Sequence, residues 1–359
     1  MAASTLTEVA RLAGVSPATA SRVLNGSARK PGKDIAERVR QAADSLGYIP
    51  NAQAQGLAKS SSGLIGLIVH DIADPYFAAI ARGVQEAARE QRKMVLLATT
   101  GGGPAEEKEA VAAFAARRAD SIVIAGSRSC RDEDAEGNAE LAAELDRYCR
   151  NGGQVAVVGH PVVGAAAQEG YHVLKVPNQE LAGQLATELA AGWDGEFVIV
   201  AGPEGLLTSD DRVRGFQEGL EQAGHRAAEV LRTTFNRSGG YDAGLQLAAR
   251  ITAAASGGAA APKLCIFAVN DVMAIGAAAA LRSEGLRIPR DAAIAGFDDI
   301  ETLRDFRPAL STVRLPLEDI GRLATRATGR HQDNGDDDGA SPGGISGEVT
   351  LRRSTEQAA

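Results

Sequence analysis

Apolar residues follow two different periodicities along this chain, and the change between them falls near residue 64. Over residues 4–48 they recur at helical spacing, as in Leu6, Val9 and Ala13. From Leu64 onward, short apolar runs alternate with amphipathic stretches, as strands alternate with helices in an α/β domain. Residues 49–63 carry no core pattern and end in a Ser/Gly run. The pattern predicts a small helical head, a linker and a larger α/β body.

Three short helices are predicted in the head. Thr5 caps the first helix. Gly14-Val15 form a tight turn, and Ser16 caps a second helix that has Pro17 at its first position and runs to about Leu24. A third helix covers about 34–46 and ends at Gly47. The expected core of the head is apolar and consists of Leu6, Val9, Val15, Ala20, Val23 and Leu24.

The body contains too many strand and helix units for one small sheet. Strands are expected at 64–72, 94–100, 121–126, 154–159, 197–202, 264–269, 292–298 and 347–355. Helices are expected at 77–91, 105–118, 181–192, 213–224, 241–252 and 273–285. This alternation predicts parallel sheets covered by helices on both faces, arranged as two lobes. Residues 329–344 are acidic and Gly-rich and are expected to form a disordered surface loop.

Charge is unevenly distributed between the head and the rest of the chain. The net charge is −8, but residues 1–60 hold eight Lys/Arg against four acids, so the head carries +4 and the remainder −12. A basic head on an acidic body is typical of a DNA-binding domain attached to a domain that DNA repels.

Several classes of protein lack support in the sequence. The first residues have no signal-peptide pattern and no run of about 18 apolar residues occurs, so we expect a cytoplasmic protein with no membrane partner. Cys130, Cys149 and Cys265 form no CxxC pair, and the five histidines have no metal-ligand spacing. Nucleophile-elbow, phosphate-loop, zinc-protease and dinucleotide motifs are also missing. We therefore expect no metal site, no cofactor, no catalytic residues and no enzyme activity.

The segment TLTEVARLAGVSPATASRVLNG closely resembles the head of the lac-repressor (LacI/GalR) family. LGYIPNAQAQGLA resembles the family's hinge. GLIVHDIADPYFAAIARGVQEAA, VAGPEG with DRVRGFQEGL, VNDVMAIGAAAALRSEGLRIPRD and GFDDIETLRDFRPALSTVRLPLEDIG follow the family's body in order. The resemblance spans roughly 330 residues and implies an N-terminal all-α helix-turn-helix head on an α/β, periplasmic-binding-protein-like body of two doubly wound lobes.

The resemblance also suggests domain limits. The head covers 1–48 and the hinge 49–63. The first lobe of the body covers 64–161 plus 298–328, and the second covers 162–297 plus 345–355.

In this motif class the second helix lies in the DNA major groove. Its N-terminal residues Ser16, Pro17, Ala18 and Thr19 would face the bases, with Ser21 and Arg22 one turn further on. Arg22 could bind the O6 and N7 of a guanine, whereas outside such a motif it would simply be a solvated arginine. The expected DNA contacts are Thr5, Ser16, Pro17, Ala18, Thr19, Ser21, Arg22, Asn25, Arg29, Ala54, Leu57 and Lys59.

By resemblance, Leu57 is the leucine that a paired hinge helix inserts into the minor groove, with Ala54 one turn earlier on the same face. The alternative is that Leu57 packs against the body. Gly56 departs from the usual family pattern and lowers helix propensity by about 1 kcal/mol, so we expect a hinge that orders only on DNA.

Six positions match family effector contacts: Tyr76, Phe77, Arg212, Phe235, Asn270 and Asp298. Their chemistry suits a polyol, because the polar groups can bind neighbouring hydroxyls and the aromatic faces can cover C–H groups. Alternatives remain open, since Tyr76 and Phe77 could be core residues and Asn270 a helix cap.

Two further positions raise separate questions. Asn178 is expected to be a cap rather than a ligand contact. Gly159-His160-Pro161 stands where the family often has an Asp, which implies either an unusual ligand or His160 as a replacement donor.

The sequence therefore favours a repressor whose partners are near-palindromic operator DNA, a small carbohydrate-like effector and a second copy of itself in a homodimer. A solute-binding receptor without DNA function is the alternative. It would share the body but would need a signal peptide and would have no use for residues 1–60.

Overall fold

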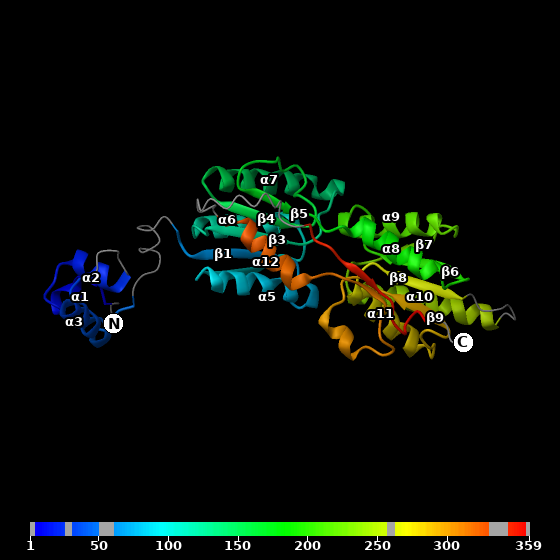
Figure 1. Cartoon of the computed structure of the whole chain (residues 1–359). Coiled ribbons are helices and arrows are strands. Elements are labelled where there is room, and N and C mark those ends of the chain that lie inside the picture. Colours follow the sequence, from blue (N-terminus) through cyan, green and yellow to red (C-terminus); the bar gives the residue numbers. More distant parts are fainter. Residues whose placement is uncertain (1–3, 26–30, 50–60, 257–262, 330–343, 357–359) are drawn as a thin grey trace. The chain divides into compact units, whose positions relative to one another are not determined.

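The computed structural model describes residues 4–25, 31–49, 61–256, 263–329 and 344–356. The chain divides into two compact units between Gly63 and Leu64, the head and the body. Figure 1 shows the elements of both units.

The described residues of the head form three helices around a small apolar core. They are α1 (Leu6–Leu12), α2 (Pro17–Asn25) and α3 (Lys33–Ser45). Thr5 accepts a hydrogen bond from the Glu8 amide while the Glu8 carboxylate accepts one from the Thr5 amide, so the predicted cap is confirmed. Ser16 Oγ accepts a bond from the Thr19 amide at 3.1 Å, as expected. The predicted core residues pack together with α3, which adds Val39, Ala42 and Ala43.

The first lobe of the body is a five-stranded parallel sheet in the order β2-β1-β3-β4-β5. The strands are β1 (Leu64–Val69), β2 (Met94–Thr99), β3 (Ser121–Ala125), β4 (Gln154–Val158) and β5 (Tyr171–Leu174). The helices are α5 (Pro75–Glu90), α6 (Pro104–Ala116), α7 (Ala135–Arg150) and α12 (Leu317–Ala327), with a 3-10 turn η1 (Asp132–Asp134). Helices α5 and α12 pack together on one face of the sheet, and α6 and α7 on the other (Figure 1).

The second lobe repeats this arrangement on a four-stranded parallel sheet in the order β7-β6-β8-β9. Its strands are β6 (Glu196–Ala201), β7 (Glu229–Arg232), β8 (Leu264–Ala268) and β9 (Ala292–Ala295). Its helices are α8 (Asn178–Ala190), α9 (Leu207–Gln222), α10 (Arg237–Ser256) and α11 (Asp271–Ser283), with a 3-10 turn η2 (Glu301–Asp305). Helices α8 and α9 form one pair, and α10 and α11 the other. The predicted two-lobed, doubly wound body is thus confirmed.

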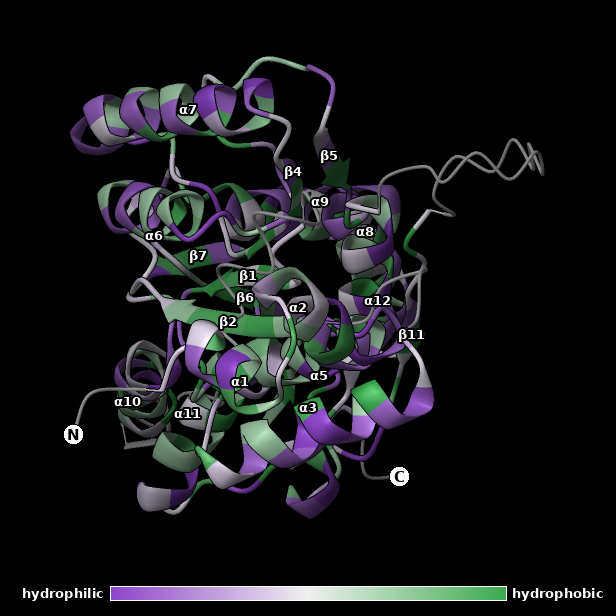
Figure 2. Cartoon of the chain, turned by 90° about the vertical axis from the view of Figure 1, so that its left-hand side faces the viewer, coloured by the Kyte–Doolittle hydropathy of each residue, from purple (hydrophilic) through white to green (hydrophobic). Residues whose placement is uncertain are grey.

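Apolar side chains fill the space between each sheet and its helices. In Figure 2 strand β2 is mostly green, and helix α7 alternates between purple and green along its length. In α7 the buried positions Leu141, Leu145 and Tyr148 lie on one face, at helical spacing. Helix α7 and strand β5 were not predicted as elements from the sequence.

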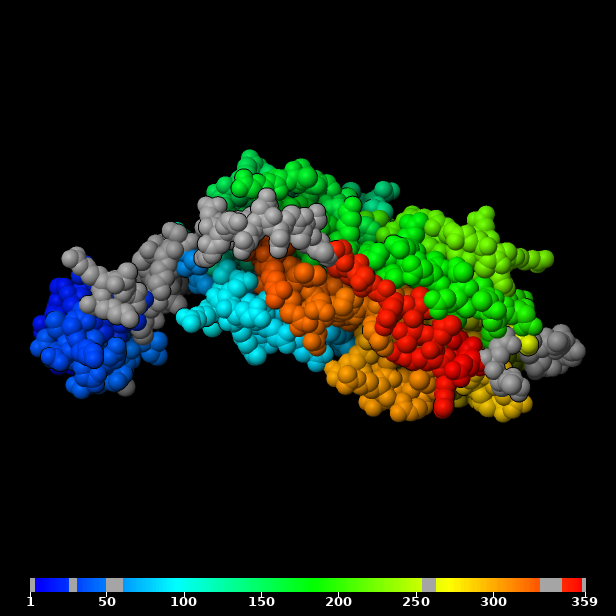
Figure 3. All heavy atoms as spheres, viewed as in Figure 1, coloured from blue at the N-terminus to red at the C-terminus, as the bar shows by residue number. Residues whose placement is uncertain are grey.

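A short antiparallel pair, β10 (Thr312–Arg314) with β11 (Glu348–Thr350), lies near the crossings between the lobes. In Figure 3 the C-terminal segment, coloured red, runs along the surface of the body from beside α12 onto the second lobe.

The predicted limits of the lobes were wrong in two places. Strand β5 belongs to the first sheet, so the first lobe continues past residue 161 to Leu174. Residues 298–311 pack against the second lobe, where Gly296 N donates to Ser311 O at 2.8 Å and Ile300 N to Asp271 Oδ2 at 3.0 Å. Only α12 of the predicted 298–328 segment covers the first sheet. The short, half-buried strand β5 carries too weak an alternation to be recognised from sequence.

Candidate functional sites

Helix α2 presents an exposed polar face at its N-terminal end. Ser16, Pro17, Ala18 and Arg22 are exposed, whereas Ala20 on the opposite face is fully buried. Ser16 and Thr19 hydroxyls are hydrogen-bonded at 2.9 Å, and Asn25 Nδ2 donates to Ser21 Oγ at 2.9 Å. The small helices therefore hold the expected reading face rigidly while Arg22 extends into solvent.

The remaining predicted DNA contacts fall in two groups. Thr5 is exposed at the start of α1, where its side chain serves as the cap. Arg29, Ala54, Leu57 and Lys59, together with Gly56, lie outside the described residues.

A cavity of about 550 Å³ lies between the two lobes of the body. All six of the predicted effector contacts line it, and they come from both lobes: Tyr76, Phe77, Arg212, Phe235, Asn270 and Asp298. Tyr76 and Phe77 belong to the first turn of α5, and Arg212 to α9. Asn270 and Asp298 follow strands β8 and β9. The cavity therefore sits at the carboxyl ends of parallel strands, where open α/β sheets bind ligands.

Arg212 is a buried polar group of this cavity, 2% exposed. Its Nε donates to Asn178 Oδ1 at 2.9 Å, its Nη1 to Val269 O at 2.7 Å and its Nη2 to Asp298 Oδ1 at 2.9 Å. The guanidinium also lies 3.8 Å from the centre of the Phe297 ring. The predicted Arg212–Asp298 pair is present, and two of the five guanidinium N–H groups remain for a ligand.

Asp298 is 4% exposed and has a φ of +119°, a backbone conformation that L side chains rarely adopt. Burial raises the pKa of its carboxyl, whereas the neighbouring Arg212 guanidinium acts in the opposite direction and favours the charged form.

The two alternatives for Asn270, Tyr76 and Phe77 turn out to be compatible. Asn270 Oδ1 accepts a bond from the Met273 amide at 2.8 Å, so this residue caps α11 and also lines the cavity. Tyr76 and Phe77 pack edge to face, 5.0 Å apart, against the main core while lining the cavity.

Asn178 does not cap α8, contrary to the sequence prediction. Pro177 occupies the cap position, and Asn178 is the first residue inside the helix, 2% exposed. Its Oδ1 instead accepts the bond from Arg212, and the residue lines the cavity. Asn178 thus positions the guanidinium.

His160 is not among the residues that line the cavity. Its Nε2 lies 2.7 Å from Asp211 Oδ2 on α9. His160 follows β4 in the first lobe and Asp211 belongs to the second, so the pair joins the two lobes. Beside the cavity a second contact joins them, because Cys130 N donates to Gly205 O and Leu207 N to Arg128 O, each at 2.9 Å.

Sequence reasoning missed several residues that line the cavity from the first lobe. They are mostly polar and include His70, Asp71, Asp74, Ser127, Ser129, Arg131 and Asp134. His70 directly follows β1, and Ser127 comes two residues after β3. Their position at the carboxyl ends of predicted strands was the available signal.

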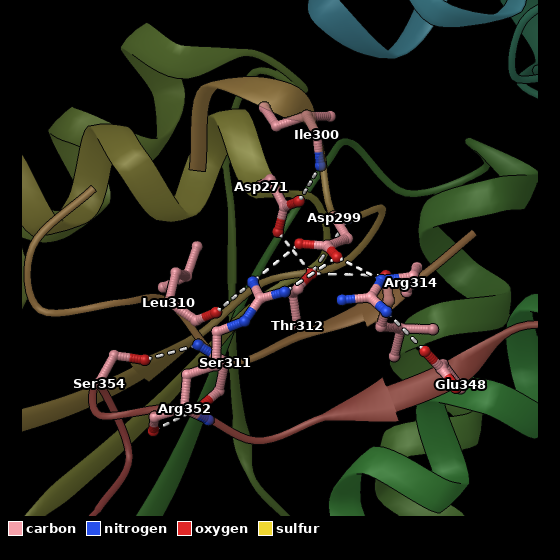
Figure 4. A network of polar contacts seen from close by, with 11 residues as sticks. Asp271, Asp299, Ile300, Leu310, Ser311, Thr312, Arg314, Glu348, Arg352 and Ser354 are labelled. Carbon is pink, nitrogen blue, oxygen red and sulfur yellow. Dashed lines mark hydrogen bonds and ion pairs between the residues drawn. The ribbon is translucent and has the colours of Figure 1, made fainter. Parts of the chain in front are cut away.

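Behind the cavity, a network of ionic contacts holds the crossing segments (Figure 4). Asp299 accepts two bonds from Arg352, at 2.8 and 2.9 Å, and one from Arg314 at 2.7 Å. Burial opposes ionisation there, but the two guanidinium groups hold the pKa of Asp299 below its usual range. Asp271 is fully buried beside this network, and burial raises its pKa to about 7.

Among the described residues, no group of three or more His, Cys, Asp or Glu side chains could hold a metal ion. No helix in this described part is long and apolar enough to cross a membrane.

Comparisons with known proteins match both units. Residues 5–51 match the family described as bacterial regulatory proteins, lacI family, and residues 195–355 match a periplasmic binding protein-like domain. The ribose operon repressor of Halalkalibacterium halodurans is 31% identical over 326 residues, which are 90% of this chain and 88% of that protein. The regulator GalS of Salmonella typhimurium is 31% identical over 328 residues, 89% of this chain and 88% of that protein.

Two solved structures match nearly the whole chain. A transcriptional regulator CelR–cellobiose complex is 26% identical with a TM-score of 0.64, covering 98% of this chain and 99% of that one. A lac repressor dimer bound to operator and an anti-inducer is 22% identical with a TM-score of 0.75, covering 99% of each chain, and this second likeness establishes the fold.

Proposed function

Because the chain belongs to the lacI family of bacterial regulatory proteins, we propose that it is a cytoplasmic repressor whose affinity for operator DNA changes when a carbohydrate binds between its lobes. The head reads the operator and the body senses the effector. The role requires no catalytic step and no cofactor.

The observation that carries this proposal is the convergence of six residues from both lobes on one cavity. Arg212, Asn270 and Asp298 supply directional polar groups, while Tyr76, Phe77 and Phe235 supply apolar faces. Carbohydrates present hydroxyls around the ring edge and C–H groups on the ring face, so they match this combination. A ligand held by residues of both lobes stabilises the closed arrangement, which is how binding would reach the head.

The named relatives support the carbohydrate class. One is called a ribose operon repressor, and one matching structure contains cellobiose. Ribose and cellobiose are linked to those relatives and not to this chain. For this chain we propose only a small polyhydroxyl compound.

DNA reading is assigned to the exposed face of α2. Arg22 is the one long cationic side chain on that helix, and it is exposed. A guanidinium binds the O6 and N7 of guanine in the major groove with two parallel hydrogen bonds. Ser16, Ala18 and Thr19 would contact neighbouring bases or phosphates at the start of the helix.

We further propose that the protein acts as a homodimer on a near-palindrome of about 14–20 base pairs. Strand β2 lies at the edge of the first sheet, and its side chains Met94 and Leu97 are 64% and 47% exposed. Helix α10 adds exposed Tyr241 and Leu245. Exposed apolar side chains on an edge strand and a helix suit contact with a second copy of the chain.

The test is selection of operator sequences from a random duplex library with the purified full chain, followed by binding titrations with and without candidate sugars. We expect a two-fold symmetric consensus and a shift in operator affinity of about 5- to 150-fold with the right sugar. Enrichment of no sequence would remove the DNA-binding assignment. A consensus with a single half-site or a direct repeat would remove the dimer.

A further inference from the structure

His70 forms part of the cavity wall in the first lobe, directly after strand β1. Its side chain is 16% exposed, and its ring lies in a slot between two glycines. A Cβ at Gly126 would lie 2.0 Å from Nε2, and one at Gly102 would lie 3.1 Å from Nδ1. The slot therefore fixes the plane of the imidazole, and a side chain at position 126 would displace it.

A buried ion pair lies behind this ring. Arg128 and Glu107 are 4% and 1% exposed, and their side chains make a two-pronged contact that includes a 2.9 Å bond from Nη2 to Oε1. Although burial favours the neutral acid, Arg128 keeps the pKa of Glu107 below its usual range. Neither residue lines the cavity, but Glu107 Oε1 lies 3.5 Å from His70 Nε2.

This arrangement favours one position for the proton of the neutral imidazole ring. A carboxylate facing Nε2 favours hydrogen on that nitrogen, which leaves Nδ1 of the neutral ring with a lone pair. Nδ1 lies on the side of the ring toward Gly102, another cavity-lining residue. His70 therefore offers the cavity a hydrogen-bond acceptor.

Two carboxylates continue the same wall. Asp71 and Asp74 precede α5, and both line the cavity. Asp71 Oδ1 accepts a bond from the Ala73 amide at 2.8 Å, and Asp74 Oδ1 accepts one from the Tyr76 amide at 2.9 Å. Within the described part of the chain, neither carboxylate lies within ion-pair distance of a cationic side chain.

The two arginines of the cavity are already paired with acids. Arg131 lies 2.6 Å from Glu133 and 3.1 Å from Asp134, and Arg212 is paired with Asp298. A glycine loop, 101–103, leads into α6, and such a helix start could hold an anion. Here the Glu106 carboxylate occupies that place, because its Oε2 would be 3.3 Å from a Cβ at Gly101.

We propose that His70, Asp71 and Asp74 form an acceptor-only subsite that binds a hydroxyl or ammonium group of the effector and rejects anionic oxygens. The buried Arg128–Glu107 pair positions the imidazole for this role. The effector is accordingly a neutral or amino-substituted carbohydrate, and its phosphorylated or carboxylated counterparts are excluded. This inference rests on the proposed function, since it specifies the chemistry of the same cavity.

The experiment uses the full chain and matched pairs of probes: D-ribose with D-ribose 5-phosphate, D-glucose with D-glucose 6-phosphate, and D-galactose with D-galacturonate. A screen of thermal stability identifies the sugar that binds, and calorimetry then gives both dissociation constants of its pair. We expect the anionic member to bind at least about ten-fold more weakly than the neutral one, because like charges face each other across a partly desolvated contact.

Variants separate the parts of the subsite. Asp71→Asn keeps the acceptor for the Ala73 amide but removes a negative charge. It should therefore reduce the difference in dissociation constant between the neutral and anionic probes. Asp132→Asn, an exposed acid outside the cavity, is the matched control and should leave this difference unchanged. His70→Ala should weaken binding of the neutral sugar about five- to ten-fold, because one hydrogen bond is lost. The control His172→Ala, on β5 away from the cavity lining, should not.

A ligand-independent measurement accompanies these titrations. Nitrogen-15 NMR of the histidine rings in the free protein should show His70 protonated on Nε2. Hydrogen on Nδ1 in the neutral ring would overturn the acceptor assignment, as would an anionic probe that binds as tightly as its neutral partner. A screen in which no sugar of either kind binds, despite intact operator binding, would instead overturn the carbohydrate effector itself.

Discussion

Arg212 Nη2 lies 2.9 Å from Asp298 Oδ1, and this contact joins the main cation of the cavity to a residue whose φ is +119°. The backbone at Asp298 also pairs with Arg314 through an isolated bridge, at the place where the chain turns toward the other lobe. Asp298 therefore belongs both to the cavity and to the crossing segment. A ligand that alters the contact between Arg212 and Asp298 acts directly on the region that sets the angle between the lobes.

Asp298→Asn should abolish most of the effector response while leaving operator binding without effector unchanged. Asparagine keeps the shape and tolerates a positive φ better than most residues, so this change isolates the charge. Asp298→Ala is a harsher change, because it leaves the buried Arg212 without its carboxylate, and it should destabilise the body by about 3–5 kcal/mol. Operator titrations with and without effector check the first expectation, and denaturant unfolding checks the second. An Asn variant that responds with wild-type sensitivity would show that the effector binds elsewhere.

Arg22→Ala should weaken operator binding by about 1–3 kcal/mol per head and relax the preference at one base pair. Arg40, an exposed arginine on α3 that lies 3.7 Å from Glu37, provides the matched control. Arg40→Ala should affect specific and random DNA alike. The measurement is affinity for the selected operator and for its single-base variants. Equal losses on operator and random DNA for Arg22→Ala would contradict base reading.

Effector binding should slow hydrogen exchange at the Cys130 and Leu207 amides. Both amides donate across the lobe junction, to Gly205 O and Arg128 O, so they can exchange only when the lobes separate. The Thr233 amide donates to Ala201 O within the second lobe and serves as the control. Exchange measured by NMR with and without a bound sugar gives the comparison. Equal protection of Cys130 and Leu207 in both states would mean that the lobes do not close on the ligand.

Asp271→Asn should stabilise the body more at pH 8 than at pH 5. Burial raises the pKa of folded Asp271 to about 7, whereas the unfolded value is about 4. Below about pH 4 the Asp271 carboxyl is protonated in both the folded and the unfolded chain. Between about pH 4 and 7 it loses its proton only in the unfolded chain. The contribution of Asp271 to the free energy of unfolding therefore falls as pH rises. The asparagine variant has no carboxyl to titrate at this position, but its side-chain oxygen can still accept the hydrogen bond from the Ile300 amide. Melting temperatures of both proteins across this range test it, and a constant difference between them would argue against the assigned pKa.

The head and the cavity could be predicted from sequence because their signals are local. Thr5 with Glu8 and Ser16 with Pro17 mark helix starts through neighbouring residues only. Asn270, Asp298 and Arg212 were expected at the effector site because they match contacts of the family that the chain resembles. The rule that parallel strands present their carboxyl ends at one edge explains why Asn270 and Asp298 meet there.

The missed features depend on contacts between distant residues. The sequence suggests that Asn178 caps a helix. In the structure Asn178 is the first residue inside that helix, and its Oδ1 accepts a hydrogen bond from Arg212, 34 positions away. His160 stands where a ligand contact was expected, but its Nε2 lies 2.7 Å from Asp211 Oδ2 on α9, a contact that only the arrangement of the two lobes creates. The Arg128–Glu107–His70 arrangement joins three segments that carry no common motif.

The lobe junction also contains an exposed thiol that a dye can label. Cys130 is exposed at the point where the lobes meet, whereas Cys149 and Cys265 are buried. Burial raises the pKa of both buried thiols, which keeps them protonated and unreactive. A thiol-directed dye would therefore attach at Cys130 in the unmodified chain, beside Gly205 of the opposite lobe. The natural sequence thus provides a single optical reporter for lobe movement, and an assay for sugars can be built on it without engineering a new attachment point.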